Sequence, residues 1–129
     1  AENIVKGQAR LVTAEESAHL YARIDVATQQ SGGSAANTAA GFASLGGACA
    51  FIGLIADDTF GQQFKHDIEQ AGVVFQPETL SGRGPTGTCI SLITPDGERT
   101  MSTHLGVAAH IAPDAVDVAT IRDSALVFL

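Results

Sequence analysis

The feature that most constrains the fold is an uncharged, largely apolar run, ACAFIGLI, at residues 48–55. Its length and composition are typical of a strand that is covered on both faces. The alanine-rich segment 34–45 before it is predicted to be a helix, and segment 60–72 after it carries an apolar stripe with three- and four-residue spacing. Strand and helix therefore alternate along the chain, which predicts an α/β domain built in layers.

A second pattern interrupts this alternation. Two strand-like runs, TCISLI and RTMSTHL, lie on either side of a Pro-Asp-Gly turn at 95–97 and predict a β-hairpin. Because the hairpin and a first strand do not follow the strand–helix rhythm, we expect a small accessory sheet beside the main one. The other predicted elements are a short strand over 3–12, a helix over 14–27, a strand over 73–80, a helix over 113–123 and a buried strand over 124–129.

Several predicted helix ends carry capping signals. Thr13 suits the N-cap position of the first helix, and Pro113 suits the first position of the last helix. Thr59 with Gln62 fits a capping box at the start of the helix that follows the apolar strand, and Gly72 fits its C-terminal cap. These signals strengthen the helix assignments.

The composition bounds the class of protein. The 129 residues are enough for one domain, and the net charge of -7 repels polyanions, so nucleic acid and anionic membranes are not expected as main partners. No apolar run approaches the ~20 residues of a membrane span, and no signal peptide is visible. Cys49 and Cys89 lie in apolar runs without metal-ligand spacing, which favours small core residues in a reducing compartment. We expect a cytoplasmic protein.

The stretch SGGSAANTAAGFASLGG places two glycines and an asparagine at the mouth of a predicted helix. Gly32 and Gly33 have no Cβ, so a ligand can approach the backbone closely. The first helical turn exposes free N–H groups, and the amide of Asn37, one turn in, can donate to one hydroxyl and accept from another. With no Lys or Arg nearby, this suits a polyol better than a phosphate. A tight turn with a local hydrogen bond is the alternative that the pattern leaves open.

The other candidate residues are less specific. Neither G-x-G-x-x-G nor a P-loop is present, so a nucleotide-cofactor domain lacks its phosphate loop. Asp57 and Asp58 either bind a metal, act as a general base or cap the following helix. A role near a pocket is open for His104 in the second hairpin strand, and no Ser/His/Asp constellation is found. The histidines expected at the surface are His19, His66 and His110.

The order of these motifs resembles that of a known family. GGSAANTAAGFASLGGACAFIGLIADDTFG resembles the first signature of the ribokinase-like (PfkB) carbohydrate kinases, and PTGTCISLITPDGERTM is similar to their adenosine-kinase-like branch. The resemblance covers nearly all of residues 6–129. One departure is Ala56, because many members have a glycine there, and it concerns the local turn. The resemblance implies part of a ribokinase-like three-layer α/β/α sandwich with a small β-sheet lid.

The resemblance also implies roles for the residues at the helix mouth. In the family, the Gly-Gly backbone and the asparagine hydrogen-bond sugar hydroxyls. On this chain, those roles would fall on Gly32, Gly33 and Asn37, with Ser34 beside them. Arg10 occupies a position from which a lid side chain could face the sugar.

The same resemblance divides the chain into a lid and a core. It implies lid strands at about 3–12 and 76–86 and an α/β core from about residue 14 onward. The adenosine-kinase-like branch lines its base pocket from the TGTC strand and the strand after GER, which implies Cys89, Thr103 and Leu105. Alternation puts positions 103 and 105 on one face of their strand. Core packing is the alternative for all three.

The activity implied for the complete protein is ATP- and Mg²⁺-dependent phosphorylation of a hydroxyl on a small sugar or nucleoside, with adenosine favoured. The family's catalytic Asp lies in a C-terminal Gly-Ala-Gly-Asp motif, which this sequence lacks. We therefore expect an N-terminal, acceptor-binding portion with no catalytic residue and no metal ligand, inactive by itself. A non-catalytic sugar- or nucleoside-binding module is the alternative. The oligomeric state stays open; because lid strands form dimer contacts in some relatives, a homodimer through the lid is one alternative.

Overall fold

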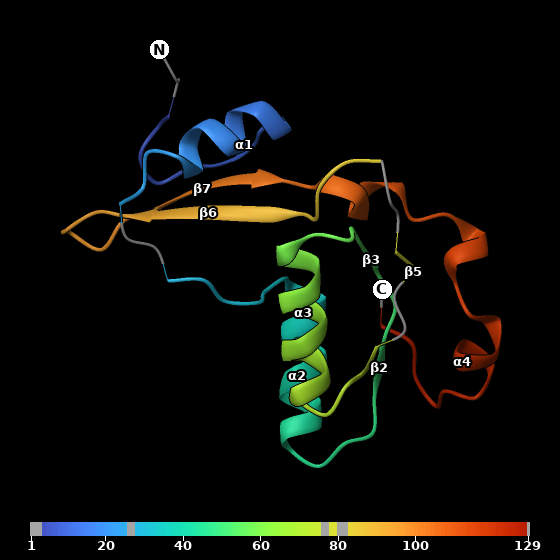
Figure 1. The fold of residues 1–129 in the computed structure, drawn as a ribbon. Coiled ribbons are helices and arrows are strands. Elements are labelled where there is room, and N and C mark those ends of the chain that lie inside the picture. Colours follow the sequence, from blue (N-terminus) through green and yellow to red (C-terminus); the bar gives the residue numbers. More distant parts are fainter. Residues whose placement is uncertain (1–3, 26–27, 76–77, 80–82, 129) are drawn as a thin grey trace.

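The computed structural model describes residues 4–25, 28–75, 78–79 and 83–128 (Figure 1). Its strands are β1 (Ala9–Leu11), β2 (Ala50–Phe51), β3 (Leu54–Ile55), β4 (Val74–Phe75), β5 (Glu78–Thr79), β6 (Thr88–Ile93) and β7 (Arg99–His104). Its α-helices are α1 (Ala14–Tyr21), α2 (Ser34–Ser44), α3 (Thr59–Gln70) and α4 (Val118–Arg122). Two short 3₁₀ helices, η1 (Gly106–His110) and η2 (Pro113–Ala115), follow β7.

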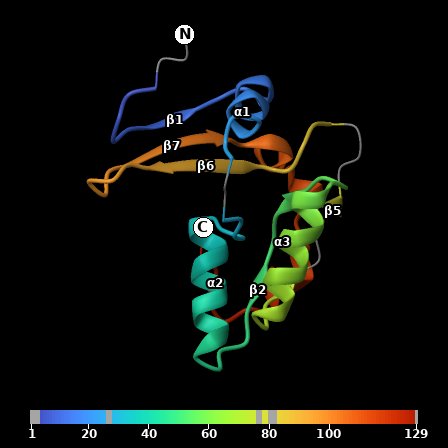
Figure 2. The ribbon, with the colours of Figure 1, turned by 60° about the vertical axis from the view of Figure 1, so that its left-hand side comes forward.

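The predicted accessory sheet is confirmed, and its strands β1, β7 and β6, in that order, are called the lid sheet below. β6 and β7 form the antiparallel hairpin around the predicted turn, and β1 runs parallel to β7. α1 covers one face of this sheet, where Ser17 Oγ lies 3.3 Å from Thr88 Oγ1 (Figure 2). Thr13 caps α1 as predicted, because its side chain accepts from the Glu16 N–H while the Glu16 carboxylate accepts from the Thr13 N–H.

The α/β core holds the remaining strands, which pair in parallel, β2 with β4 and β3 with β5. The predicted strand over 48–55 is found in place but is divided, because Ile52 and Gly53 separate β2 from β3. A glycine inside a strand weakens it, which is consistent with the interruption. Within the segment 76–86, assigned above to the lid, β5 pairs with β3 in the core. The rest of that segment up to residue 82 lies outside the described residues.

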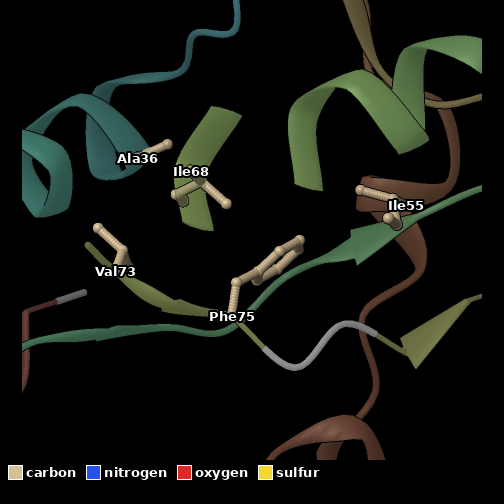
Figure 3. Close-up of a cluster of buried hydrophobic side chains, with 5 residues drawn as sticks. All are labelled: Ala36, Ile55, Ile68, Val73 and Phe75. Atoms are coloured by element: carbon tan, nitrogen blue, oxygen red, sulfur yellow. The ribbon is translucent and has the colours of Figure 1, made fainter. Parts of the chain in front are cut away.

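Helices α2 and α3 are held to the core strands by a cluster of buried apolar side chains. Phe64 of α3 packs against this cluster, and its ring meets that of Phe75 edge to face, with centroids 5.5 Å apart. Burying each such side chain stabilises the fold by roughly 1.5–3 kcal/mol, so the amphipathic pattern of α3 fixes its orientation. The buried members of the cluster are Ala36, Ile55, Ile68, Val73 and Phe75 (Figure 3).

The C-terminal predictions are wrong in two respects. The helix expected over 113–123 is split into η2 and the five-residue α4. The cause is Asp117, whose carboxylate accepts from the N–H groups of Ala119 and Thr120 and so starts a new helix. The segment expected to be a buried strand over 124–129 is exposed in its described part, residues 124–128, with Leu126 at 84%, and no described strand pairs with it. A buried strand needs hydrogen-bonded neighbours on its edges.

Other local expectations need smaller corrections. α1 ends at Tyr21, well before residue 27. The N-cap of α3 is Asp58 and not Thr59, which is the first helical residue. Cys89 was expected in the core but is exposed, because its position on β6 faces away from α1, whereas Cys49 is half-buried.

Candidate functional site

The entry to α2 is shaped by its two glycines. Gly33 is the N-cap residue with φ +107° and ψ 135°, a conformation that residues with a Cβ rarely adopt. A Cβ at Gly32 would meet nothing within 4 Å, and one at Gly33 would meet only the Ala36 Cβ at 4.0 Å. No side chain caps this helix end, so the N–H groups of the first turn are open to a ligand.

The polar residues beside these glycines are exposed. Ser34 is the first residue of α2, and Asn37 lies one turn in, with its backbone N–H bonded to the Gly33 carbonyl at 2.8 Å. This bond uses only the backbone N–H, so the exposed side-chain amide of Asn37 can still contact a ligand. The structure thus brings Gly32, Gly33, Ser34 and Asn37 together at one helix end, as the sequence predicts.

This helix end points toward the lid sheet. Figures 1 and 2 both show the N-terminal ends of α2 and α3 directed at the face of the lid sheet opposite α1. The glycine entry and the uncovered face of the lid sheet are therefore on the same side. Such an arrangement suits a small ligand held between the core and a lid.

The predicted base-pocket residues lie on this uncovered face or at its end. Cys89 and Thr103 are register partners on β6 and β7, and the Thr103 hydroxyl donates to the Cys89 Sγ at 3.3 Å. Leu105 follows β7 and is 47% exposed. Thr103 and Leu105 share a groove of about 300 Å³ with β1 and η1 residues; its lining is Leu11, Val12, Thr13, Thr103, His104, Leu105, Gly106, Ala109 and His110.

The groove includes residues that sequence reasoning did not place there. Leu11 is the register partner of Thr103 across β1 and β7, so it shares the uncovered face. The pairing of distant strands cannot be read from local spacing, and this is why Leu11 was missed. His104 lines the groove, which keeps the predicted role near a pocket open, and His110 lines it from η1 while remaining exposed as expected.

Arg10 lies on the other face of the lid sheet. Its register partner is Ser102, which is buried on the α1 side, and its Nη1 lies 3.6 Å from a carboxylate oxygen of Glu16 in α1. The Arg10 Nε and Nη2 atoms are buried without a hydrogen-bond partner in the described part of the chain. The geometry therefore does not bring Arg10 to the face that carries Cys89 and Thr103.

The Asp58 carboxylate caps α3 and also accepts hydrogen bonds from Thr86. It accepts from the Gly61 N–H at 2.8 Å, the Thr86 N–H at 2.8 Å and the Thr86 hydroxyl at 2.7 Å. Burial raises the pKa of Asp58, but the hydrogen bonds from Thr86, Gly61 and Phe60 outweigh burial and leave the pKa below its usual value. The capping alternative is confirmed.

Thr86 is a positioning residue that the sequence did not reveal, and it lies in the segment 76–86 assigned above to the lid. It is 7% exposed, and its Oγ1 also accepts from the Ala56 N–H at 3.0 Å. Ala56 adopts this turn without a positive φ, so the departure from the family's glycine is accommodated. The chain therefore enters β6 from a fixed point on the core.

Among the described residues, no group of three or more His, Cys, Asp or Glu side chains could hold a metal ion. No Lys or Arg occurs in the sequence between Arg23 and Lys65, which spans the glycines before α2 and the start of α3.

In the part of the chain that the structure describes, no helix is long and apolar enough to cross a membrane.

Comparison with known proteins agrees with this architecture. The family model described as pfkB family carbohydrate kinase matches residues 8–128. The chain belongs to this family. Its α/β core with a β-sheet lid is therefore the ribokinase-like fold of PfkB kinases, as the sequence signatures predict.

Individual PfkB relatives span both nucleoside and sugar kinases. The adenosine kinase structure from Sinorhizobium meliloti is 44% identical with a TM-score of 0.85, covering 93% of this chain and 37% of that chain. A probable sugar kinase structure from Rhizobium etli is 41% identical with a TM-score of 0.84, covering 93% and 36%. An ATP-dependent ribose-1-phosphate kinase from Halopiger xanaduensis is 34% identical, covering 74% of this chain and 32% of its own length. The chain thus spans about a third of these relatives.

Proposed function

We propose that this chain binds the acceptor in an ATP-dependent kinase that phosphorylates a hydroxyl of a small sugar or nucleoside. Membership of the PfkB family and the kinase names of its relatives support the reaction class. The similarity to the Sinorhizobium meliloti adenosine kinase favours adenosine as the acceptor. The single observation that carries the proposal is the open, uncharged helix entry at Gly32–Gly33, directed at the uncovered face of the lid sheet.

The chemistry of this entry suits neutral hydroxyl groups. Gly32 and Gly33 leave room for a ligand against the backbone, and the N–H groups at the start of α2 donate to its oxygens. The Asn37 amide offers both a donor and an acceptor, which matches a pair of sugar hydroxyls. A phosphate would require cationic side chains, which this stretch lacks.

Each part of the chain then has a distinct task in the proposed reaction. Asn37 and the glycine backbone orient the acceptor hydroxyl, while Cys89, Thr103 and Leu105 contact the base or the carbon face of the acceptor. The lid sheet covers the bound acceptor and excludes water. ATP supplies the phosphoryl group. The sequence has no Gly-Ala-Gly-Asp motif, so the 129 residues alone are expected to transfer no phosphate.

A binding panel tests the acceptor site. Thermal shift and titration calorimetry on the protein that carries this sequence should detect one of adenosine, ribose, fructose or 2-keto-3-deoxygluconate. Asn37→Ala should weaken that binding about tenfold or more, because a ligand hydrogen bond is lost at each end of the amide. Ser44→Ala at the other end of α2 is the matched control and should have no effect. Unchanged affinity in Asn37→Ala would refute the site.

A non-catalytic sugar- or nucleoside-binding module is the second candidate, favoured by the uncharged start of α2, since no Lys or Arg occurs between Arg23 and Lys65. Acceptor binding by the same protein without ATP-dependent product formation would support the binding module.

We further propose a cytoplasmic location and a homodimer through the lid sheet, whose edge strands are β1 and β6. Light scattering of the wild-type protein and of a variant with Ile93→Lys on β6, where Ile93 is 71% exposed, tests the dimer.

A further inference from the structure

The segment that leads into Gly32 and Gly33 is tied to α3 by the carboxylate of Asp67. This segment, residues 28–33, is called the glycine loop here. Ser31, directly before Gly32, donates its hydroxyl to Asp67 Oδ2 at 2.6 Å. The other oxygen of that carboxylate, Asp67 Oδ1, accepts from Gln63 Nε2 at 2.7 Å. Both Ser31 and Asp67 are half-buried, and 36 residues separate them in sequence.

The glycine loop needs such a tether next to its glycines, because the hydrogen bond from Gln29 to the Tyr21 hydroxyl restrains the loop only on the N-terminal side of Ser31. Gly32 and Gly33 lose more backbone entropy on ordering than any other residue type. No atom would contact a Cβ at Gly32 within 4 Å, so packing does not fix the loop at that point. A hydrogen bond to a charged group next to the glycines restricts the backbone where the ligand would bind.

Asp67 is well placed to provide a fixed anchor. Its neighbour Ile68 is 4% exposed and belongs to the core cluster, so the α3 backbone at this point is held by packing. Gln63, one turn earlier on α3, holds one carboxylate oxygen and thereby leaves the other oriented toward Ser31. One hydrogen bond, from Ser31 to Asp67, therefore connects the loop to α3, and the bond from Gln63 orients the Asp67 carboxylate within the helix.

We propose that Asp67 is a positioning residue for acceptor binding, which acts through Ser31 to hold the glycine loop in its binding conformation. This inference rests on the proposed function, because it assumes that the acceptor occupies the helix entry. Without the anchor, only a fraction of molecules has the loop in place, and the apparent affinity for acceptor falls by that fraction. Neither Asp67 nor Ser31 needs to touch the acceptor for this effect.

A double-mutant cycle on the protein that carries this sequence tests the inference. Acceptor affinity is measured by titration calorimetry with adenosine, ribose and fructose for wild type, Ser31→Ala, Asp67→Ala and the double variant. Each single variant should lose about tenfold in affinity, and the double variant should lose no more than either single one, since both break the same contact. Ser31→Thr, which keeps the hydroxyl, should retain affinity within about threefold.

Two controls separate loop positioning from general stability. Glu69→Gln, on the same helix but two residues away, should leave affinity unchanged, because that carboxylate pairs with Lys65. The thermal midpoint of the ligand-free variants should stay close to that of wild type, whereas a merely structural role would lower it without a change in affinity.

The outcomes are distinguishable. If wild type binds none of the three probes, the proposed function fails, and the inference fails with it. If wild type binds a probe but the two single losses multiply in the double variant, or if neither single variant weakens binding, the anchor is overturned while the acceptor site stands.

Discussion

Asp58→Ala should destabilise the junction between the α/β core and the lid sheet. The Asp58 carboxylate accepts hydrogen bonds from Gly61 at the start of α3 and from Thr86, which leads into β6. Removing it leaves the N–H groups of Gly61 and Thr86 and the hydroxyl of Thr86 without this acceptor. Since Thr86 is only 7% exposed, water cannot readily replace the lost partner.

The expected loss follows from these contacts. An N-cap side chain contributes about 1 kcal/mol, and hydrogen bonds to a charged group contribute roughly 1.5–3 kcal/mol each. The lowest of these values add up to about 4 kcal/mol. Because Asp58 is partly exposed and the Thr86 hydroxyl keeps its bond from the Ala56 N–H, we expect a smaller total loss of about 3 kcal/mol. Asp58→Asn keeps one acceptor oxygen but places an NH₂ group against a hydrogen-bond donor. Its loss of stability should therefore be about half that of Asp58→Ala.

Urea unfolding of the protein that carries this sequence measures this loss. Asp57→Ala is the matched control: the Asp57 carboxylate accepts only from the exposed Gln62 side chain among the described contacts, so its loss should stay within about 0.5 kcal/mol. Equal losses in the two variants would refute the reasoning.

The stability lost in Asp58→Ala should depend on pH. The pKa of Asp58 is lowered in the folded protein, so its stabilisation is complete above the ordinary aspartate pKa of about 4. As the pH falls through the lowered pKa, the carboxylate is protonated and the stabilisation is lost. The difference between wild type and Asp58→Ala should therefore shrink below about pH 4. A difference that grows as the pH falls would contradict the assigned direction.

The remaining predictions concern single backbone and capping positions and share the urea assay. Gly61→Ala should cost about 2–3 kcal/mol, because a Cβ there would lie 2.2 Å from the Ala56 carbonyl oxygen. Gly41→Ala, in an open position of α2 with nothing within 4 Å, should instead stabilise by about 0.5–1 kcal/mol. Thr13→Ala should cost about 1 kcal/mol through loss of the capping box, and an unchanged unfolding midpoint would contradict that role.

The sequence predicts those parts of the fold that depend on local signals. The stripe that includes Phe64 and Ile68 predicts α3 because helical spacing is a property of neighbouring residues. The Pro-Asp-Gly turn predicts the hairpin of β6 and β7 for the same reason, and Thr13 predicts the start of α1. The position of Gly32 and Gly33 at the start of α2 was predictable, because a glycine pair directly before an alanine-rich run is a local signal for a helix start.

The errors arise where tertiary contacts decide. Asp117 looks like an ordinary helical residue in the pattern, but its side chain caps the following turn and divides the predicted helix. The apolar residues 124–128 carry the composition of a buried strand, yet no described strand lies beside them to complete its hydrogen bonds. Composition states that a segment prefers burial; it does not supply the neighbour that buries it.

The site shows the same division between local and distant information. The residues at the start of α2 are close in sequence and were predicted together. Leu11 and Asp67 were not, because the first depends on the register of β1 against β7 and the second on a contact between the glycine loop and α3. Arg10 shows the risk of placing a strand residue without its register, since a change of one position moves a side chain to the opposite face.

The placement of charge gives this part of the chain a consistent chemical character. Arg10 pairs with Glu16 on the α1 face of the lid sheet, so this cation is used in packing and does not face the core. The uncovered face carries Cys89 and Thr103, and the helix entry carries glycines and an amide, all of them uncharged. These uncharged groups suit a ligand that is selected by shape and hydrogen bonds, whereas Arg99, which shares the face with Thr103 by strand alternation, lies at the hairpin-turn end of β7. Under the proposed function, we therefore expect substitutions at the start of α2 to alter acceptor binding without altering ATP binding.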